Sequence, residues 1–199
     1  GRLVLLDLSE SNLHAIALDL AERAPGLQVE TKLADIRDEF RMQELFASLK
    51  PQVIIHAAAN KHVPLMESHP CEAIRVNLGG TRTLANAALR YGCEAFVLIS
   101  TDKAVNPTNV MGAAKRAAEL YVRACSEEAG GHFLSVRFGN VLGSTGSIMP
   151  LFERQIEQGG PVTITDPNMT RWFMTVEEAG ALVLQAAALG AGVTGQSGG

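Results

Sequence analysis

Val53-Ile-Ile-His-Ala-Ala-Ala-Asn60 is a short apolar run that ends in three alanines and an amide. Such a run is apolar on both faces, as a strand in the middle of a parallel sheet is. Phe96-Val-Leu-Ile99 has the same character and leads directly into Ser100-Thr-Asp-Lys103. We therefore predict two buried strands with polar groups at their carboxyl ends, the place where ligands of such sheets bind.

Short aliphatic runs alternate with longer helical patterns on both sides of these strands. Strands are expected at Leu3–Asp7, Leu27–Ala34, Gln52–Ala57, Ala95–Ser100, Phe133–Phe138 and Val162–Ile164. Helices are expected at Glu10–Ala24, Glu39–Leu49, Cys71–Tyr91, Met111–Ala129, Ile148–Gln158 and Val176–Leu189. The alternation predicts an α/β fold with a doubly wound parallel sheet and right-handed crossovers. We expect one domain, with a cofactor part at residues 1–139 and an interleaved substrate part at residues 140–199.

Composition excludes several classes of protein. The net charge of −4 provides no basic surface for nucleic acid, so no nucleic-acid partner is expected. Cys71, Cys93 and Cys125 are widely spaced and form no ligand pattern, so neither a disulfide framework nor a metal site is expected. No apolar run reaches the roughly 18 residues of a membrane span, and no signal peptide opens the chain.

The first half of the chain carries candidate cofactor residues. Asp7 closes an apolar strand, where a carboxylate can bind an adenosine ribose and repel a 2′-phosphate, which favours NAD over NADP; a simple helix cap is the alternative. Ala57, Ala58 and Ala59 would let a flat cofactor approach the backbone, unless they merely fill the core. Asp35 and Ile36 also follow a strand. The glycine-rich turn of dinucleotide sites is absent, and we expect it, with a first strand, upstream of Gly1.

The segment after Ile99 carries the candidate catalytic residues. Thr101, Asp102 and Lys103 place a hydroxyl, a carboxylate and an amine side by side, and Ser100, which precedes them, is assigned to the cofactor site. Lys115 lies four residues beyond Met111 and so on the same helix face. This spacing suits a site in which Lys115 holds a cofactor ribose while position 111 faces the substrate. A solvated helical lysine and a loop ion pair are the alternatives.

The whole segment Ser100-Thr-Asp-Lys-Ala-Val-Asn-Pro-Thr-Asn-Val-Met-Gly-Ala-Ala-Lys115 resembles the signature of the polysaccharide-biosynthesis branch of extended short-chain dehydrogenases/reductases. That branch has a Rossmann-like fold and contains the UDP-N-acetylglucosamine 4,6-dehydratases. Further matching stretches are Val4–Asp7, Asn60–Glu67, Asn77–Thr81, Arg137–Ser144 and Thr170–Met174. The resemblance implies a lyase with an internal NAD redox cycle, and it adds Lys61 and Asn77 to the cofactor residues.

Met111 occupies the position at which the wider superfamily has a tyrosine base. A thioether cannot take a proton, yet larger members of the branch also have methionine there, so the first base is left open. The implied mechanism assigns the sugar hydroxyl proton to Thr101 with Lys115, and the C5 proton to Lys103. Asp102, kept protonated, would then release the C6 hydroxyl as water.

The substrate side is expected to hold a UDP sugar. Asn140, Ser144 and Ser147 lie in a glycine-rich loop suited to uracil, ribose or phosphate contacts, and Arg171 could clamp the pyrophosphate. His62 could line the sugar pocket, although a loop histidine is more often solvated. The resemblance also implies a homo-oligomer that pairs the helices at 71–91 and 111–129. It further implies a cytoplasmic domain whose full-length protein is held at the membrane by an N-terminal region.

Two other functions fit the same sequence. A nucleotide-sugar 4-epimerase or reductase of this fold would want a working tyrosine at position 111 and would not need the pair Asp102 and Lys103. A catalytically silent dinucleotide sensor or scaffold would explain both Met111 and the absent glycine turn.

Overall fold

The computed structural model describes residues 1–130, 132–143, 148–164 and 166–192. The chain begins with β1 (Arg2–Asp7), α1 (Glu10–Arg23) and β2 (Gln28–Leu33). β1 and β2 form a parallel two-stranded sheet in which Arg2 lies opposite Gln28 and Asp7 opposite Leu33. α1 packs on this pair and starts at Ser9, whose side chain accepts a hydrogen bond from the backbone of Asn12.

A second parallel sheet has the strand order β3-β4-β5. Its strands are β3 (Val53–His56), β4 (Ala95–Thr101) and β5 (Phe133–Phe138). The register places His56 beside Leu98 and Thr101 beside Phe138, so the three strands end at one edge. The strands predicted at Ala95–Ser100 and Phe133–Phe138 are confirmed, and β3 forms within the predicted range 52–57.

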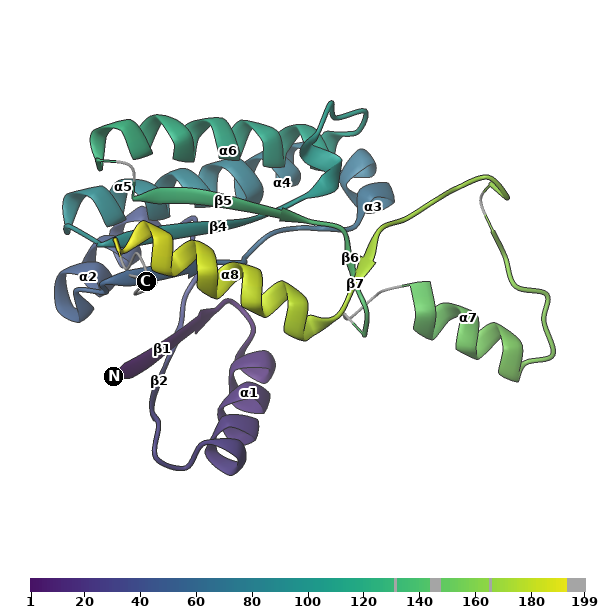
Figure 1. Cartoon of the computed structure of the whole chain (residues 1–199), viewed down its shortest axis with the longest axis horizontal. Coiled ribbons are helices and arrows are strands. Elements are labelled where there is room, and N and C mark those ends of the chain that lie inside the picture. The colour runs from purple at the N-terminus through teal and green to yellow at the C-terminus, as the bar shows by residue number, and fades with distance from the viewer. Residues whose placement is uncertain (131, 144–147, 165, 193–199) are drawn as a thin grey trace, which may run out of the picture.

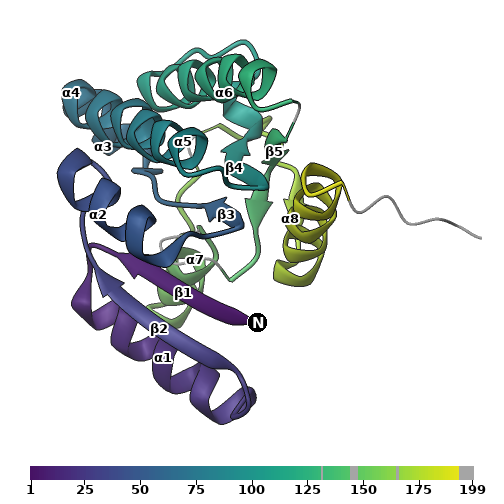
Figure 2. The ribbon, with the colours of Figure 1, turned by 90° about the vertical axis from the view of Figure 1, so that its left-hand side faces the viewer.

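Helices cover both faces of this sheet (Figure 1). One face carries α5 (Thr81–Arg90) and α6 (Val110–Glu128), which pack on each other, and the other face carries α8 (Val176–Gly190). α2 (Glu39–Leu49) packs against α5 and lies between it and the β1–β2 pair (Figure 2). This alternation of layers is the predicted α/β arrangement.

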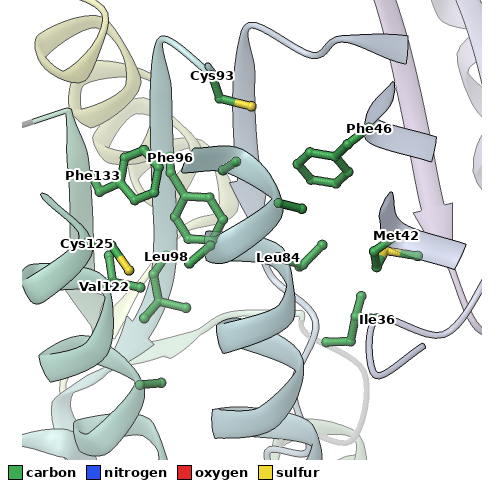
Figure 3. Close-up of a cluster of buried hydrophobic side chains, with 14 of the residues drawn as sticks. Ile36, Met42, Phe46, Leu84, Cys93, Phe96, Leu98, Val122, Cys125 and Phe133 are labelled. Carbon is green, nitrogen blue, oxygen red and sulfur yellow. The ribbon is translucent and has the colours of Figure 1, made fainter. Parts of the chain in front are cut away.

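The main core fills the space between α2, α5, α6 and the sheet (Figure 3). Phe96 of β4 and Phe133 of β5 stack with ring centroids 5.2 Å apart, and Leu98 and Val122 close the α6 side. Met42, the largest side chain that α2 buries completely, approaches from the other side. Because this core clamps β4 on one face, the end of β4 is a rigid base for the residues that follow it.

The helix predicted over Cys71–Tyr91 is one continuous helical path with changes of winding. It consists of α4 (Pro70–Ala73), a π-helical segment (Ile74–Gly80) and α5, after the short helix α3 (Val63–Ser68). At Gly80 an added Cβ would overlap the side chain of Ile36, so a larger residue there would require Ile36 to repack where the path crosses the core. A π-helical turn of this kind often marks a functional region.

The substrate part departs from the prediction. Residues 162–164 form no strand; instead β6 (Asn140–Val141) pairs in parallel with β7 (Phe173–Met174). α7 (Ile148–Glu157) lies beside this pair on an arm that extends from the domain (Figure 1). At Gly139 an added Cβ would overlap the carbonyl oxygen of Trp172, so the glycine permits the β6–β7 pairing.

β3 differs from the prediction in its surroundings. Among the described residues it pairs only with β4, so it is an edge strand rather than a central one. Val53 and Ile55 are 42% and 46% exposed as a result, although the run is apolar on both faces. Within the described ranges, no helix combines the length and the apolar character needed to cross a bilayer.

Candidate functional site

A cavity of about 380 Å³ opens where β3, β4 and β5 end and α6 begins. This volume lies within the range of small-molecule sites. Ten of the predicted site residues line it: Ala57, Ala59, Lys61, His62, Ser100, Thr101, Lys103, Met111, Lys115 and Asn140. The residues come from four separate elements, and the shared edge of the sheet brings them together.

Thr101, Asp102 and Lys103 form a hydrogen-bonded cluster at the end of β4. The hydroxyl of Thr101 donates to Asp102 Oδ1 at 2.9 Å, and the ammonium of Lys103 donates to the same oxygen at 3.0 Å. Asp102 to Ala104 form one turn of 3₁₀-helix, with the Thr101 side chain accepting from the backbone of Lys103. Lys103 Nζ also lies 3.4 Å from Asn140 Oδ1, which connects the cluster to the start of β6, just beyond β5.

The expectation that Asp102 is kept protonated is wrong for this arrangement. Partial burial pushes the pKa of Asp102 upward, but the hydrogen bonds from Lys103 and Thr101 outweigh burial and hold the pKa below its ordinary value. Asp102 is therefore an ionised acceptor at neutral pH. Asp102 can act as an acid only after it has accepted a proton.

Met111 and Lys115 occupy the first turns of α6. That helix begins where two side chains accept hydrogen bonds from its free backbone N–H groups: Asn109 from Gly112 and Glu67 from Val110. Met111 is buried beside Met66 and Ala73, and it also lines the cavity.

Lys115 is a buried lysine on the wall of the cavity. Its ammonium donates to the carbonyl oxygen of Ile99 at 2.9 Å, and its side chain is almost completely covered. Burial lowers the pKa of Lys115 to about 8, with the negative charge of Glu119 acting against this shift. The alternative of a solvated helical lysine is therefore wrong.

A neutral histidine lies behind the same wall. His56 is buried, and burial together with the charge of Lys115 lowers its pKa to about 3. Its Nε2 lies 2.9 Å from Thr81 Oγ1, and the Thr81 hydroxyl donates its hydrogen bond to the carbonyl oxygen of Asn77. Nε2 must then be the donor, so His56 is uncharged with its hydrogen on Nε2.

The alanines after β3 leave the strand end open. Ala57 and Ala58 are exposed and Ala59 is half-buried, so the alternative that the three fill the core is wrong. Lys61 and His62 follow in an exposed loop and line the cavity.

Four predicted cofactor residues make contacts that differ from the expected ones. The buried amide of Asn77 bonds both the N–H and the carbonyl oxygen of Asn60, so it fixes the loop after β3 instead of facing a ligand. The Ser100 hydroxyl donates to Glu119 at 2.6 Å. Ile36 packs in the core. Asp35 is held by the guanidinium of Arg37, whose hydrogen bonds lower the pKa of that carboxyl.

Four further predicted residues lie away from the cavity or outside the described residues. Asp7 is exposed and accepts a hydrogen bond from the backbone of Ser9, which is itself the N-cap of α1, so Asp7 is not the helix cap of the alternative interpretation. Arg171 bonds the carbonyl oxygen of Thr170 and Met169 Sδ, both in its own loop, and does not line the cavity. Ser144 and Ser147 lie outside the described residues.

Sequence reasoning missed the apolar wall and the buried acid. Phe138, Val141, Leu142, Met149 and Phe173 line the cavity opposite Lys115. Phe138 was within reach of prediction, because it ends a strand beside Thr101, whereas Phe173 reaches the cavity through the β6–β7 pairing. Glu119 was missed because nothing in a helical glutamate signals burial. Among the described residues, no group of three or more His, Cys, Asp or Glu side chains could hold a metal ion.

The model of the family described as "Polysaccharide biosynthesis protein" matches residues 1–194. The chain belongs to this family. The probable polysaccharide biosynthesis protein EpsC of Bacillus subtilis is 50% identical over 191 residues, which are 96% of this chain and 32% of that protein. This chain thus spans about a third of the length of that relative.

Two relatives carry more specific descriptions. A UDP-N-acetylglucosamine 4,6-dehydratase (inverting) of Campylobacter jejuni is 38% identical over 76% of this chain and 46% of its own length. A UDP-glucose 4-epimerase of Rickettsia rickettsii is 40% identical over 77% of this chain and 46% of its own length. The solved structure of Pen from Bacillus thuringiensis superposes with a TM-score of 0.84 at 32% identity, over 94% of this chain and 58% of that one. The Rossmann-like fold is confirmed.

Proposed function

We propose that this chain is the catalytic part of a nucleotide-sugar 4,6-dehydratase that acts on UDP-N-acetylglucosamine. The observation that carries the proposal is the cluster of Thr101, Asp102 and Lys103 in one cavity with Lys115. A dehydratase needs a base and an acid beside C5 and C6 of the sugar, and this cluster supplies a carboxylate and an amine joined by a 3.0 Å hydrogen bond.

The cavity fits NAD on its β3 side. The exposed small side chains at Ala57 and Ala58 leave room for a flat ring system, and the Lys115 ammonium is a donor for ribose hydroxyls. NAD, when bound, supplies the acceptor and later the donor of one hydride. In this proposal Asp7 would meet the adenosine ribose by turning away from Ser9.

The first proton follows the hydrogen bonds already present. The sugar C4 hydroxyl gives its proton to Thr101 Oγ1, while Thr101 passes its own hydrogen to Asp102 Oδ1 along the 2.9 Å bond. Lys115, as the ammonium, stabilises the negative charge that develops on the oxygens. Asp102 thereby becomes the acid that the elimination requires, and Met111 needs to take no proton.

The elimination then uses the neighbouring pair. Lys103, once its ammonium has given a proton to solvent, removes the C5 proton, which the 4-keto group has made acidic. Asp102 gives its proton to the departing C6 hydroxyl, which leaves as water. Lys103 returns its proton to C5 after hydride arrives at C6, so the sugar has lost one water and both side chains regain their starting states.

Product analysis with the full-length protein tests this proposal. We expect UDP-N-acetylglucosamine to give a 4-keto-6-deoxy product that is lighter by one water, detected by mass spectrometry. Lys103→Ala and Asp102→Asn should each slow water loss by about 10²-fold, the scale of a single acid or base. Unchanged water loss in either variant would contradict the assignment.

The same assay separates the alternatives. The 40% identity to a UDP-glucose 4-epimerase makes an epimerase the second candidate. An epimerase would invert C4 and keep the 6-hydroxyl, and a sensor would bind nucleotide without turnover. Met111 argues against an epimerase that depends on a tyrosine base.

The pKa of Lys115 sets the expected pH dependence. Since burial lowers that pKa to about 8, the amine loses its charge as the pH rises through this value. We expect kcat/KM for UDP-N-acetylglucosamine to fall on the alkaline side with a midpoint near pH 8. The profile should keep about nine-tenths of its full value at pH 7, and an alkaline limb near pH 10 would show that Lys115 need not be charged.

The proposed partners follow from the same reading. The UDP part of the substrate would occupy the side of Asn140, with Arg171 reaching the pyrophosphate only if its loop moves. α5 and α6 pack on each other and remain the proposed subunit interface (Figure 1). We also propose that the full-length protein works at the cytoplasmic face of the membrane.

A further inference from the structure

Glu119 is a carboxylate with unusual surroundings for a helix of this kind. It lies on α6, one turn beyond Lys115 and on the same face, and only 5% of its side chain is exposed. Burial of a charge is costly unless hydrogen bonds and opposite charges compensate for it. Four such bonds are present, and they come from three elements.

Each bond ties Glu119 to a residue beside the cavity or on its own helix. Oε1 accepts from the Ser100 hydroxyl at 2.6 Å and from Arg137 Nε at 2.7 Å. Oε2 accepts from Arg137 Nη2 and from Arg116 Nη1. Ser100 directly precedes Thr101, and Arg137 lies three residues before Asn140. One carboxylate thus joins the ends of β4 and β5 to the helix that carries Lys115.

Glu119 supplies the negative charge that stabilises the charged form of Lys115. On β3, His56 is neutral, and at the end of β4 the charges of Asp102 and Lys103 offset each other. Arg137 of β5, Arg116 of α6 and Lys61 after β3 are cations, and His62 also lines the cavity. Glu119 is the neighbour whose charge opposes the loss of the Lys115 proton.

We infer that Glu119 is a positioning residue that fixes the ends of β4 and β5 against α6 and keeps Lys115 positively charged at the cavity wall. The role of that charge in catalysis rests on the proposed function; the coupling between the two side chains does not. Glu119 itself does not line the cavity, so it acts through Lys115 and Ser100.

The test measures the protonation of Lys115 without substrate. The full-length protein is trace-labelled with acetic anhydride at a series of pH values, and mass spectrometry quantifies the peptide that contains Lys115. Wild type should show a midpoint near pH 8. Glu119→Gln should move it roughly one pH unit lower, the scale of a lost neighbouring charge, whereas Glu127→Gln, which removes an exposed carboxylate of the same helix, should leave it in place.

A folded Glu119→Gln protein with an unchanged midpoint would overturn the inference. If circular dichroism shows that this variant does not fold, Arg116→Gln tests the coupling with the opposite sign. The Arg116 side chain is 42% exposed, so its loss should be tolerated, and removal of this cation should raise the midpoint. A midpoint that stays or falls in Arg116→Gln would overturn the inference equally. Absence of dehydratase activity would contradict the proposed function alone.

Discussion

Lys115→Met is expected to lower kcat/KM of the proposed dehydratase reaction by about 10³-fold, because it removes a buried positive charge from the cavity wall where, in this proposal, negative charge develops on the sugar oxygens. The free energy of unfolding, in contrast, should not fall in this variant. A pKa lowered from 10.5 to about 8 means that the charged amine costs the fold on the order of 3 kcal/mol at neutral pH. Methionine has a similar shape and carries no such cost, so the melting temperature should stay or rise.

The pH dependence of the stability difference gives a second test of the same variant. Between about pH 8 and 10.5 the unfolded wild-type chain holds the Lys115 proton more tightly than the folded one, so the contribution of Lys115 to stability improves as the pH rises. The stability gap between Lys115→Met and wild type should therefore narrow across this range in chemical denaturation. Arg123→Met, at an exposed position of the same helix, is the control. Near-normal kcat/KM in Lys115→Met would refute the role of the charge.

Gly112→Ala should reduce kcat/KM by about 10²-fold, the effect of a displacement of about 1 Å in a catalytic group. A Cβ at position 112 would overlap the carbonyl oxygen of Lys103, which is backbone and cannot swing aside. Either the turn from Asp102 to Ala104 or the start of α6 must move, and both carry the cluster. Overpacking of this kind should also cost about 1–3 kcal/mol of unfolding free energy.

Gly180→Ala is the matched control. Gly180 lies inside α8 and has nothing within 4 Å of an added Cβ. Alanine there should stabilise the helix by about 1 kcal/mol and leave activity unchanged. The two substitutions are chemically identical, so opposite shifts in melting temperature would isolate the contact with Lys103. A stabilised and fully active Gly112→Ala protein would contradict the packing argument.

Local sequence was enough to predict the centre of the site. Thr101, Lys103, Met111 and Lys115 lie within sixteen residues, in a strand, a turn and a helix whose order fixes their direction. Hydrophobic runs place β4 in the core, and the carboxyl end of a parallel strand is where its polar residues must gather. The confirmed elements share this property: each is specified by its own residues.

Features that depend on distant partners were not predictable in the same way. The β-branched run at 162–164 looks like a strand but pairs with no strand in the described part of the chain, whereas the two-residue β7 forms because Gly139 lets Trp172 approach. The sequence predicts that Asn77 and Ser100 contact the ligand, yet their hydrogen bonds go to Asn60 and Glu119. The charge of Asp102 depends on burial set against two hydrogen bonds, a balance that only the folded chain defines.

The edge position of β3 has a consequence for handling the chain in solution. A strand with one unpaired row of backbone N–H and C=O groups is a template for strand addition by another molecule. Val53 and Ile55 add exposed apolar side chains to that template, and no charged residue lies between them. The net charge of −4 opposes association only over the range of electrostatic screening, so added salt should favour self-association of the isolated chain through this edge.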